Sequence, residues 1–135
     1  TVRSSSLKGT TVGGDIIPRL IDELPIIAVA AVFADGQTVI KDAQELKVKE
    51  TNRIRAVVDE FNKCGIDITE TDYGMIINGG KSIHGADFKT YGDHRMAMSL
   101  TVLAQLADSE STLDDSDCAC VSYPTFFDDF YKLGE

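Results

Sequence analysis

The stretch Phe33-Ala34-Asp35-Gly36-Gln37-Thr38-Val39-Ile40-Lys41-Asp42 resembles the later stretch Leu106-Ala107-Asp108-Ser109-Glu110-Ser111-Thr112-Leu113-Asp114-Asp115. In both, an apolar run ends in an acidic turn, and a short strand pattern follows. A second match joins residues 61–65 to residues 130–134. Because the matches follow the order of the expected helices and strands, the sequence predicts an α/β (α+β) fold of repeated βαβα(ββ) units. The chain has room for about two units, which we place approximately at residues 1–80 and 81–135.

Four segments are typical of helices, because each carries an apolar run or an apolar face. Residues 25–34 begin with proline and are followed by Asp35-Gly36, which is the usual asymmetry of a helix. Residues 49–64 are the clearest amphipathic helix, with apolar residues at i, i+3, i+4 and i+7 and a glycine after the last turn. The remaining expected elements are helices at 96–107 and 126–133, and strands at 1–12, 37–41, 67–71, 75–78 and from 112 onward.

The overall charge argues against two classes of partner. The chain has 135 residues and a net charge of −9, which argues against a surface that binds nucleic acids or anionic membranes, since both need clustered cations; a local basic pocket is still compatible with this charge. The longest apolar run, residues 25–34, is too short to cross a bilayer, and the first residues show no secretory signal. The chain also lacks an initiator methionine, so we expect a segment of a longer cytoplasmic protein.

The cysteines indicate reduced thiols. There are three, an odd count without the spacing of a disulfide framework, as is typical of cytosolic proteins. Cys118-Ala119-Cys120 offers half of a metal site, but no second pair and no histidine cluster completes it. We therefore expect no metal site.

The segment Gly92-Asp93-His94-Arg95 carries the strongest functional signal. Asp93 is a good N-cap for the helix that follows. His94 and Arg95 then enter the first turn, where the helix dipole favours anions and disfavours cations. Their position is explained if they bind a phosphate or a carboxylate, and the alternative is a salt bridge to one of the many acidic side chains.

A second charged group opens the helix expected at 49–64. Within it, Glu50 and Arg53 share a face, and so do Lys49 and Arg53. A surface ion pair explains them equally well, although such a pair contributes little stability. Their place at a helix start favours a bound anion, with Glu50 as a candidate general acid or base.

Asp22 precedes the helix expected at 25–34. It either caps that helix or accepts hydrogen bonds from a substrate hydroxyl, and the residues alone leave both open. The internal repeat aligns it with Arg95, also at the start of a buried helix. If the helices run parallel, all these charged groups converge at one end of the domain.

Four motifs span nearly the whole chain: Ile21-Asp22-Glu23-Leu24-Pro25, Lys47-Val48-Lys49-Glu50-Thr51-Asn52-Arg53, Gly92-Asp93-His94-Arg95-Met96-Ala97-Met98 and Ser122-Tyr123-Pro124-Thr125-Phe126-Phe127. In this order they resemble the 5-enolpyruvylshikimate-3-phosphate synthase family (3-phosphoshikimate 1-carboxyvinyltransferase). The resemblance covers the later part of the family's C-terminal lobe. It implies a fold of two lobes, each built from three βαβαββ units, with the missing N-terminal lobe as a partner of this chain in a monomeric enzyme.

The resemblance also implies a reaction. The enolpyruvyl group of phosphoenolpyruvate moves to the 5-hydroxyl of shikimate 3-phosphate, and phosphate is released. The mechanism is addition through a tetrahedral ketal followed by elimination, in the pathway to chorismate and aromatic amino acids. By the same resemblance, Asp22 contacts the shikimate hydroxyls and accepts a proton, and Glu50 protonates the enol methylene.

The binding residues are implied in the same way. Lys49 matches a lysine that contacts shikimate 3-phosphate, and Arg53 and Arg95 match arginines that clamp phosphoenolpyruvate, with His94 beside the clamp. No metal and no organic cofactor is implied. The sequence departs from the family at residues 118–122, because the lysine that usually precedes the Tyr-Pro or Phe-Pro pair is missing there.

Other functions compete with this one. The first is the related transferase that acts on UDP-N-acetylglucosamine, and the second is a non-catalytic module of the same fold that binds a phosphorylated metabolite. An RNA-phosphate enzyme of similar architecture is disfavoured by the acidic charge. Without the N-terminal lobe, we expect no turnover by the chain alone and at most weak anion binding.

Overall fold

The computed structural model describes residues 1–133, and its larger sheet forms one outer layer. Its strands are β1 (Thr11–Val12), β2 (Gln37–Ile40), β3 (Asp67–Thr71) and β4 (Gly74–Asn78), in the order β1-β2-β4-β3. The β1–β2 pair is parallel, and the other two pairs are antiparallel. Thr71 pairs with Gly74, so the predicted hairpin turns through two residues between β3 and β4.

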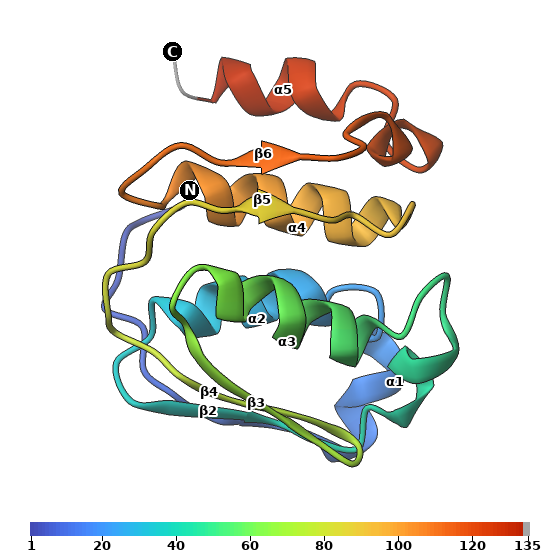
Figure 1. Ribbon diagram of the computed structural model, residues 1–135. Helices are drawn as coiled ribbons and strands as arrows, with labels where there is room; N and C mark the ends of the chain where they lie inside the picture. The colour runs from blue at the N-terminus through green and yellow to red at the C-terminus, as the bar shows by residue number, and fades with distance from the viewer. Residues whose placement is uncertain (134–135) are drawn as a thin grey trace.

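Helices α2 (Leu24–Val32) and α3 (Arg53–Lys63) lie over one face of this sheet, as Figure 1 shows. The short helix α1 (Ile17–Leu20) and the 3-10 turns η1 (Gly14–Ile16) and η2 (Gln44–Val48) lie in the connections. Proline in the first turn of α2 lacks only an amide that has no partner at that position, so it favours the helix start. After α3, Gly65 takes a φ of +77°, which ends the helix as the sequence predicts.

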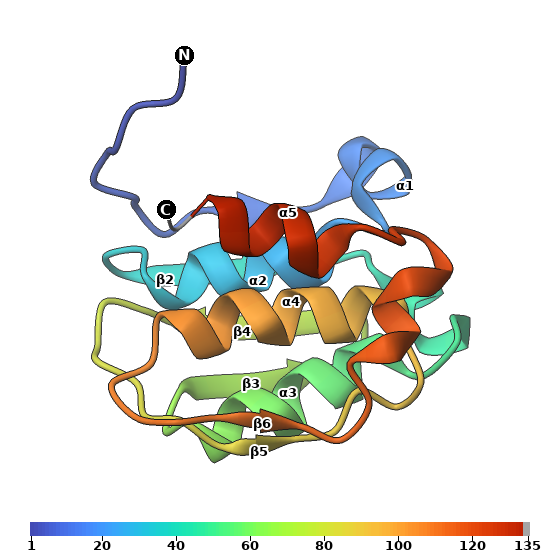
Figure 2. The same ribbon diagram turned by 90° about the horizontal axis from the view of Figure 1, so that it is seen from above.

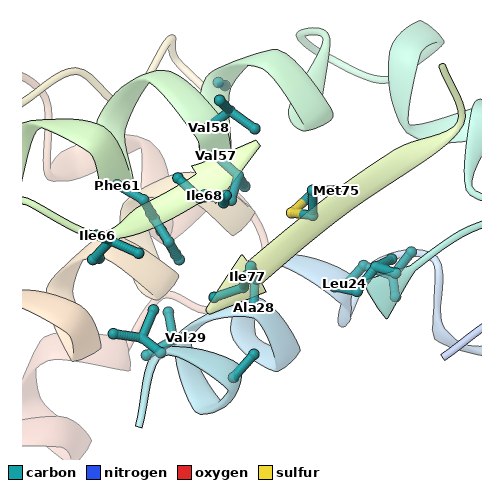
Figure 3. Packing of buried hydrophobic residues seen from close by; sticks show 14 of the residues in the cluster. Leu24, Ala28, Val29, Val57, Val58, Phe61, Ile66, Ile68, Met75 and Ile77 are labelled. Atoms are coloured by element: carbon teal, nitrogen blue, oxygen red, sulfur yellow. The ribbon is translucent and has the colours of Figure 1, made fainter. Parts of the chain in front are cut away.

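The core lies between α2, α3 and the larger sheet (Figure 3). The apolar face of α3 is buried as its helical spacing predicts, with exposed fractions of 6% or less at the four positions Ile54, Val57, Val58 and Phe61. These side chains meet Leu24, Ala28 and Val29 of α2 and Ile68, Met75 and Ile77 of the sheet.

The second part of the chain repeats the order strand, helix, parallel strand, helix. Strand β5 (Asp87–Phe88) pairs in parallel with β6 (Thr112–Leu113) in a two-stranded sheet. Helix α4 (His94–Gln105) joins them, and the 3-10 turn η3 (Asp117–Val121) leads to α5 (Phe126–Lys132). In Figures 1 and 2 the four longer helices all begin at the same end of the molecule. The division into units at 1–80 and 81–135 stays a prediction.

The structure corrects several boundaries. The strand expected at 1–12 is limited to Thr11–Val12, apart from an isolated bridge at Lys8. The helix expected at 49–64 begins only at Arg53, because Asn52 caps it. Strand β5 was not expected at all. Gly134, the expected end of the last helix, lies outside the described residues. No helix within residues 1–133 has both the length and the apolarity needed to cross a membrane.

Candidate active site

Helices α3 and α4 begin side by side, each with a capping side chain. The Asn52 side-chain oxygen accepts a hydrogen bond from the Arg55 amide at 3.2 Å. Asp93 Oδ1 accepts from the Arg95 amide at 2.8 Å and the Met96 amide at 3.3 Å, which confirms the predicted N-cap of α4. The caps fix where the following side chains point.

Arg53 is the centre of the charged cluster, and its side chain is only 1% exposed. Its Nε and Nη2 atoms donate to the two carboxylate oxygens of Asp93, at 2.8 and 3.2 Å. Nη1 donates to Asp22 Oδ1 at 2.9 Å, and Nη2 also donates to Glu50 Oε2 at 2.7 Å. One buried guanidinium thus joins carboxylates from three separate segments of the chain.

The pKa values of this cluster shift in the direction of stronger ionisation. Burial alone would lower the pKa of Arg53, but hydrogen bonds and charge from Asp93, Asp22 and Glu50 outweigh it and raise that pKa. Burial likewise opposes the anion of Asp22, but the Arg53 hydrogen bond and the charges of Lys49, Arg53 and Arg95 lower its pKa overall. Without a ligand, Asp22 is therefore an ionised hydrogen-bond acceptor.

Lys49 and Glu50 reach this cluster from outside the helix. Both precede the Asn52 cap, so the expectation that they lie in the first turn of α3 is wrong. Lys49 Nζ lies 3.5 Å from Asp22 Oδ1, with its side chain 30% exposed. The Glu50 side chain is 47% exposed and open to a ligand. The dipole of α3 therefore acts on Arg53, the first residue of the helix, and not on Lys49.

Arg95 points toward a cavity between α2, α4 and the start of α5. Its Nη1 atom is 3.8 Å from Glu23 Oε1, a loose ion pair. Its Nε atom is buried and has no hydrogen-bond partner among residues 1–133. The cavity has a volume of about 240 Å³, and it is lined by Asp22, Ile26, Arg95, Met98, Ser99, Val102, Tyr123 and Phe126.

The cavity is walled mainly by apolar and aromatic side chains. In the described part of the chain, Arg95 is the one cationic side chain that lines it. Near the Tyr-Pro pair, the wall is formed instead by the rings of Tyr123 and Phe126, which meet edge to face at 5.7 Å. His94, the first residue of α4, is half-buried beside Arg95.

The comparisons with known proteins now bear on this geometry. The family model described as EPSP synthase (3-phosphoshikimate 1-carboxyvinyltransferase) matches residues 1–130. A 3-phosphoshikimate 1-carboxyvinyltransferase from Listeria innocua serovar 6a is 57% identical over 133 residues, which is 98% of this chain. The chain belongs to the EPSP synthase family. A relative of the same name from Bacillus cereus strain B4264 is 55% identical over all 135 residues.

Solved structures share this fold. An EPSP synthase from Acinetobacter baumannii matches 91% of this chain with a TM-score of 0.87 and 38% identity. The enolpyruvyl transferase NikO from Streptomyces tendae, at 22% identity and a TM-score of 0.71, shares the fold. The chain spans 31% and 32% of the Listeria and Bacillus relatives and 29% of the Acinetobacter chain.

The structure brings the residues expected from the EPSP synthase resemblance to one end of the helices. Asp22, Lys49, Glu50 and Arg53 are joined by direct contacts, and Asp22 and Arg95 line one cavity. Arg53, however, is already surrounded by carboxylates. Of the two buried or half-buried arginines at this end, Arg53 and Arg95, only Arg95 has a buried guanidinium nitrogen without a partner in the described residues, so it is the better prepared to bind an anion.

Sequence reasoning missed the second role of Asp93. Besides capping α4, it is the two-point partner of Arg53, with both carboxylate oxygens in use. It also missed Glu60, which is 1% exposed on α3 and bonded to the segment before α4. The available signal was the position of Glu60: residues 54–61 contain two acidic residues, and Glu60 lies three residues after Val57, at the edge of the apolar face, where a buried charge needs partners.

Proposed function

We propose that this chain supplies part of the active site of an enzyme that transfers the enolpyruvyl group of phosphoenolpyruvate to the 5-hydroxyl of shikimate 3-phosphate. Phosphate is the other product, and the pathway leads to aromatic amino acids. The observation that carries the proposal is the cavity where Arg95, with an unpartnered buried nitrogen, faces Asp22 at the edge of the Arg53 cluster. Family membership favours this substrate pair over UDP-N-acetylglucosamine.

The two proposed catalytic carboxylates differ in environment. Glu50 is half exposed and bonds to one Arg53 nitrogen, so a substrate can reach it, and it is proposed to give a proton to the methylene carbon of phosphoenolpyruvate. The 5-hydroxyl oxygen then bonds to C2, and its proton passes to Asp22. Phosphate then leaves with the proton held by Asp22, and return of a methyl proton to Glu50 restores the double bond in the product and both carboxyl groups to their starting states.

The proposed binding roles depend on how fully each cationic group is already hydrogen-bonded within the described residues. Arg95 binds the phosphate or carboxylate of phosphoenolpyruvate, with His94 beside it, while Lys49 contacts shikimate 3-phosphate. Arg53 contributes mainly by holding Asp22 and Glu50 in place, and it reaches phosphoenolpyruvate only if one of them gives up its hydrogen bond. Burial alone would raise the pKa of Asp22, but the Arg53 hydrogen bond and the charges of Lys49, Arg53 and Arg95 lower it, which makes Asp22 a weak base. A ligand that draws Lys49 or Arg95 away removes part of this lowering.

The test is phosphate release by a chimera in which these 135 residues replace the matching 31% of the Listeria innocua relative. We expect the chimera to release phosphate only when both substrates are present, and the isolated chain to release none. A chimera that unfolds cooperatively yet shows no turnover would contradict the proposal and favour a binding module. Turnover by the isolated chain would contradict the need for a second lobe.

A further inference from the structure

The segment from β5 to α4 is held from both sides by carboxylates that the proposed chemistry does not use. Glu60 of α3 is 1% exposed, and its Oε2 atom accepts hydrogen bonds from Lys63 Nζ at 2.6 Å and from the Lys89 amide at 2.9 Å. Its Oε1 atom accepts from the Tyr91 hydroxyl at 2.8 Å. One buried carboxylate therefore fixes two positions of the segment.

Three further hydrogen bonds hold neighbouring residues of this segment in place. Lys63 Nζ also donates to the Asp87 carbonyl at 3.0 Å. On the other side, Asp114 Oδ1 accepts from the Thr90 amide at 2.8 Å and from its hydroxyl at 3.0 Å. Thr90 is fully buried between the two attachments.

The backbone of this segment needs such support. Tyr91 has a φ of +57° and Gly92 a φ of +63°, so two successive residues take the left-handed conformation just before Asp93. Glycine adopts this conformation readily, whereas a tyrosine keeps it only when its surroundings hold it. The hydrogen bond from the Tyr91 hydroxyl to Glu60 stabilises this conformation. Burial of the hydroxyl and this hydrogen bond together raise the pKa of Tyr91.

The Tyr91–Gly92 turn precedes two residues of the candidate site, Asp93 and Arg95. Asp93 follows directly. It caps α4 and accepts hydrogen bonds from Arg53 with both carboxylate oxygens, and Arg95 lies in the first turn of the helix. A shift of the turn would move Asp93 and Arg95 together.

We propose that Glu60 is a positioning residue, which fixes the Tyr91–Gly92 turn and thereby aims Arg95 at the anion that the cavity accepts. The inference rests on the proposed function, because it assigns Glu60 to the phosphoenolpyruvate clamp. Its geometric part, the coupling of Glu60 to the start of α4, can be tested without activity.

The first experiment measures hydrogen exchange of backbone amides in the 135-residue chain. Glu60→Gln keeps the size of the side chain but offers one acceptor oxygen to three donors, and Tyr91→Phe removes a single hydrogen bond. Asp59→Asn, an exposed neighbour on α3 that pairs with Arg55, is the matched control. We expect exchange at the Arg95 and Met96 amides to rise roughly tenfold in both variants, with α2 unchanged.

An unchanged rate at these amides, or a uniform rise throughout the chain, would overturn the positioning role. Tyr91→Phe keeps the experiment decisive if Glu60→Gln does not fold. Asp59→Asn is expected to exchange as the unmodified chain does.

The second experiment measures kinetics in the Listeria chimera. We expect Tyr91→Phe and Glu60→Gln to raise KM for phosphoenolpyruvate roughly tenfold, with KM for shikimate 3-phosphate changed less than about twofold. A merely stabilising role would lower Tm and leave both KM values unchanged, and this result would overturn the assignment to the clamp. If the unmodified chimera releases no phosphate, the proposed function fails, while the exchange rates still decide the coupling.

Discussion

The two parts of the chain share an order of elements but differ in how fully they are buried. In the first part, α3 has seven buried residues and packs against a four-stranded sheet. In the second part, α5 has no buried residue, and the sheet has two strands of two residues each. The same sequence of strand, helix, strand and helix thus yields one well-packed layer and one open layer.

The difference shows which helices can carry a rigid site. Aromatic side chains of α5 contact one another, as in the stacked rings of Phe126 and Phe130 at 5.7 Å. They line a hollow of about 510 Å³ between α4 and α5. The charged cluster instead lies at the starts of α2, α3 and α4, and each of these three helices has at least six buried residues, so we expect the cluster to stay ordered independently of α5.

The largest expected effect comes from Asp93→Ala, because it leaves the Arg53 guanidinium buried without its main partner and uncaps α4. Breaking a buried ion pair and losing an N-cap should together cost about 4–6 kcal/mol in free energy of unfolding, measured by urea titration. Asp93→Asn keeps the cap and should recover about 1 kcal/mol. Asp129→Ala on the exposed α5 should cost less than about 1 kcal/mol. Equal losses at Asp93 and Asp129 would erase the contrast between the buried helix starts and the exposed α5.

The same contrast applies to apolar side chains. Phe61→Ala removes a fully buried ring from the core and should cost about 3–5 kcal/mol. Phe130→Ala removes a partly exposed ring and should cost about 1 kcal/mol or less in free energy of unfolding, because folding removes only part of this ring from water. Both values come from chemical unfolding at one pH and temperature. A cost for Phe130→Ala equal to that of Phe61→Ala would mean that α5 is part of the main core.

The smallest effect concerns acid stability. Because the folded-state pKa of Asp22 is lowered, its contribution to stability is present above the unfolded pKa and is lost as pH falls through the folded pKa. Asp22→Asn should therefore flatten the fall in stability below about pH 4. The effect should stay below about 1 kcal/mol, since the side chain is 42% exposed and screened by solvent. Parallel pH profiles for the two proteins would contradict this assignment.

Much of the fold was predictable because its signals are local. The proline and glycine that bracket α2, the helical spacing of α3, the hairpin of β3 and β4, and the Asp93 cap each depend on neighbouring residues. Strand β5 was missed because two residues show no periodicity, and they pair with β6 only through tertiary contacts. The start of α3 was misplaced because Lys49 and Glu50 fit a helical pattern that the Asn52 cap interrupts.

The residues of the candidate site were predictable, but their hydrogen-bond partners were not. Charged residues at helix starts indicated that Asp22, Arg53 and Arg95 would approach one another. The sequence could not show that Arg53 would be enclosed by carboxylates while Arg95 kept an unpartnered nitrogen. Both arginines lie in the first turn of a helix, just after its capping residue, so their sequence patterns are alike. That distinction depends on side-chain geometry.

The central claim, that Arg95 is the cation of this chain that grips phosphoenolpyruvate, is tested most directly by phosphate release from Arg95→Gln and Arg55→Gln forms of the Listeria chimera. Arg55 is an exposed arginine in the first turn of α3, paired with Asp59 and Glu70, and serves as the matched control. We predict that Arg95→Gln lowers kcat/KM for phosphoenolpyruvate roughly a hundredfold, while Arg55→Gln changes it less than about twofold. Equal values for the two variants would contradict the account.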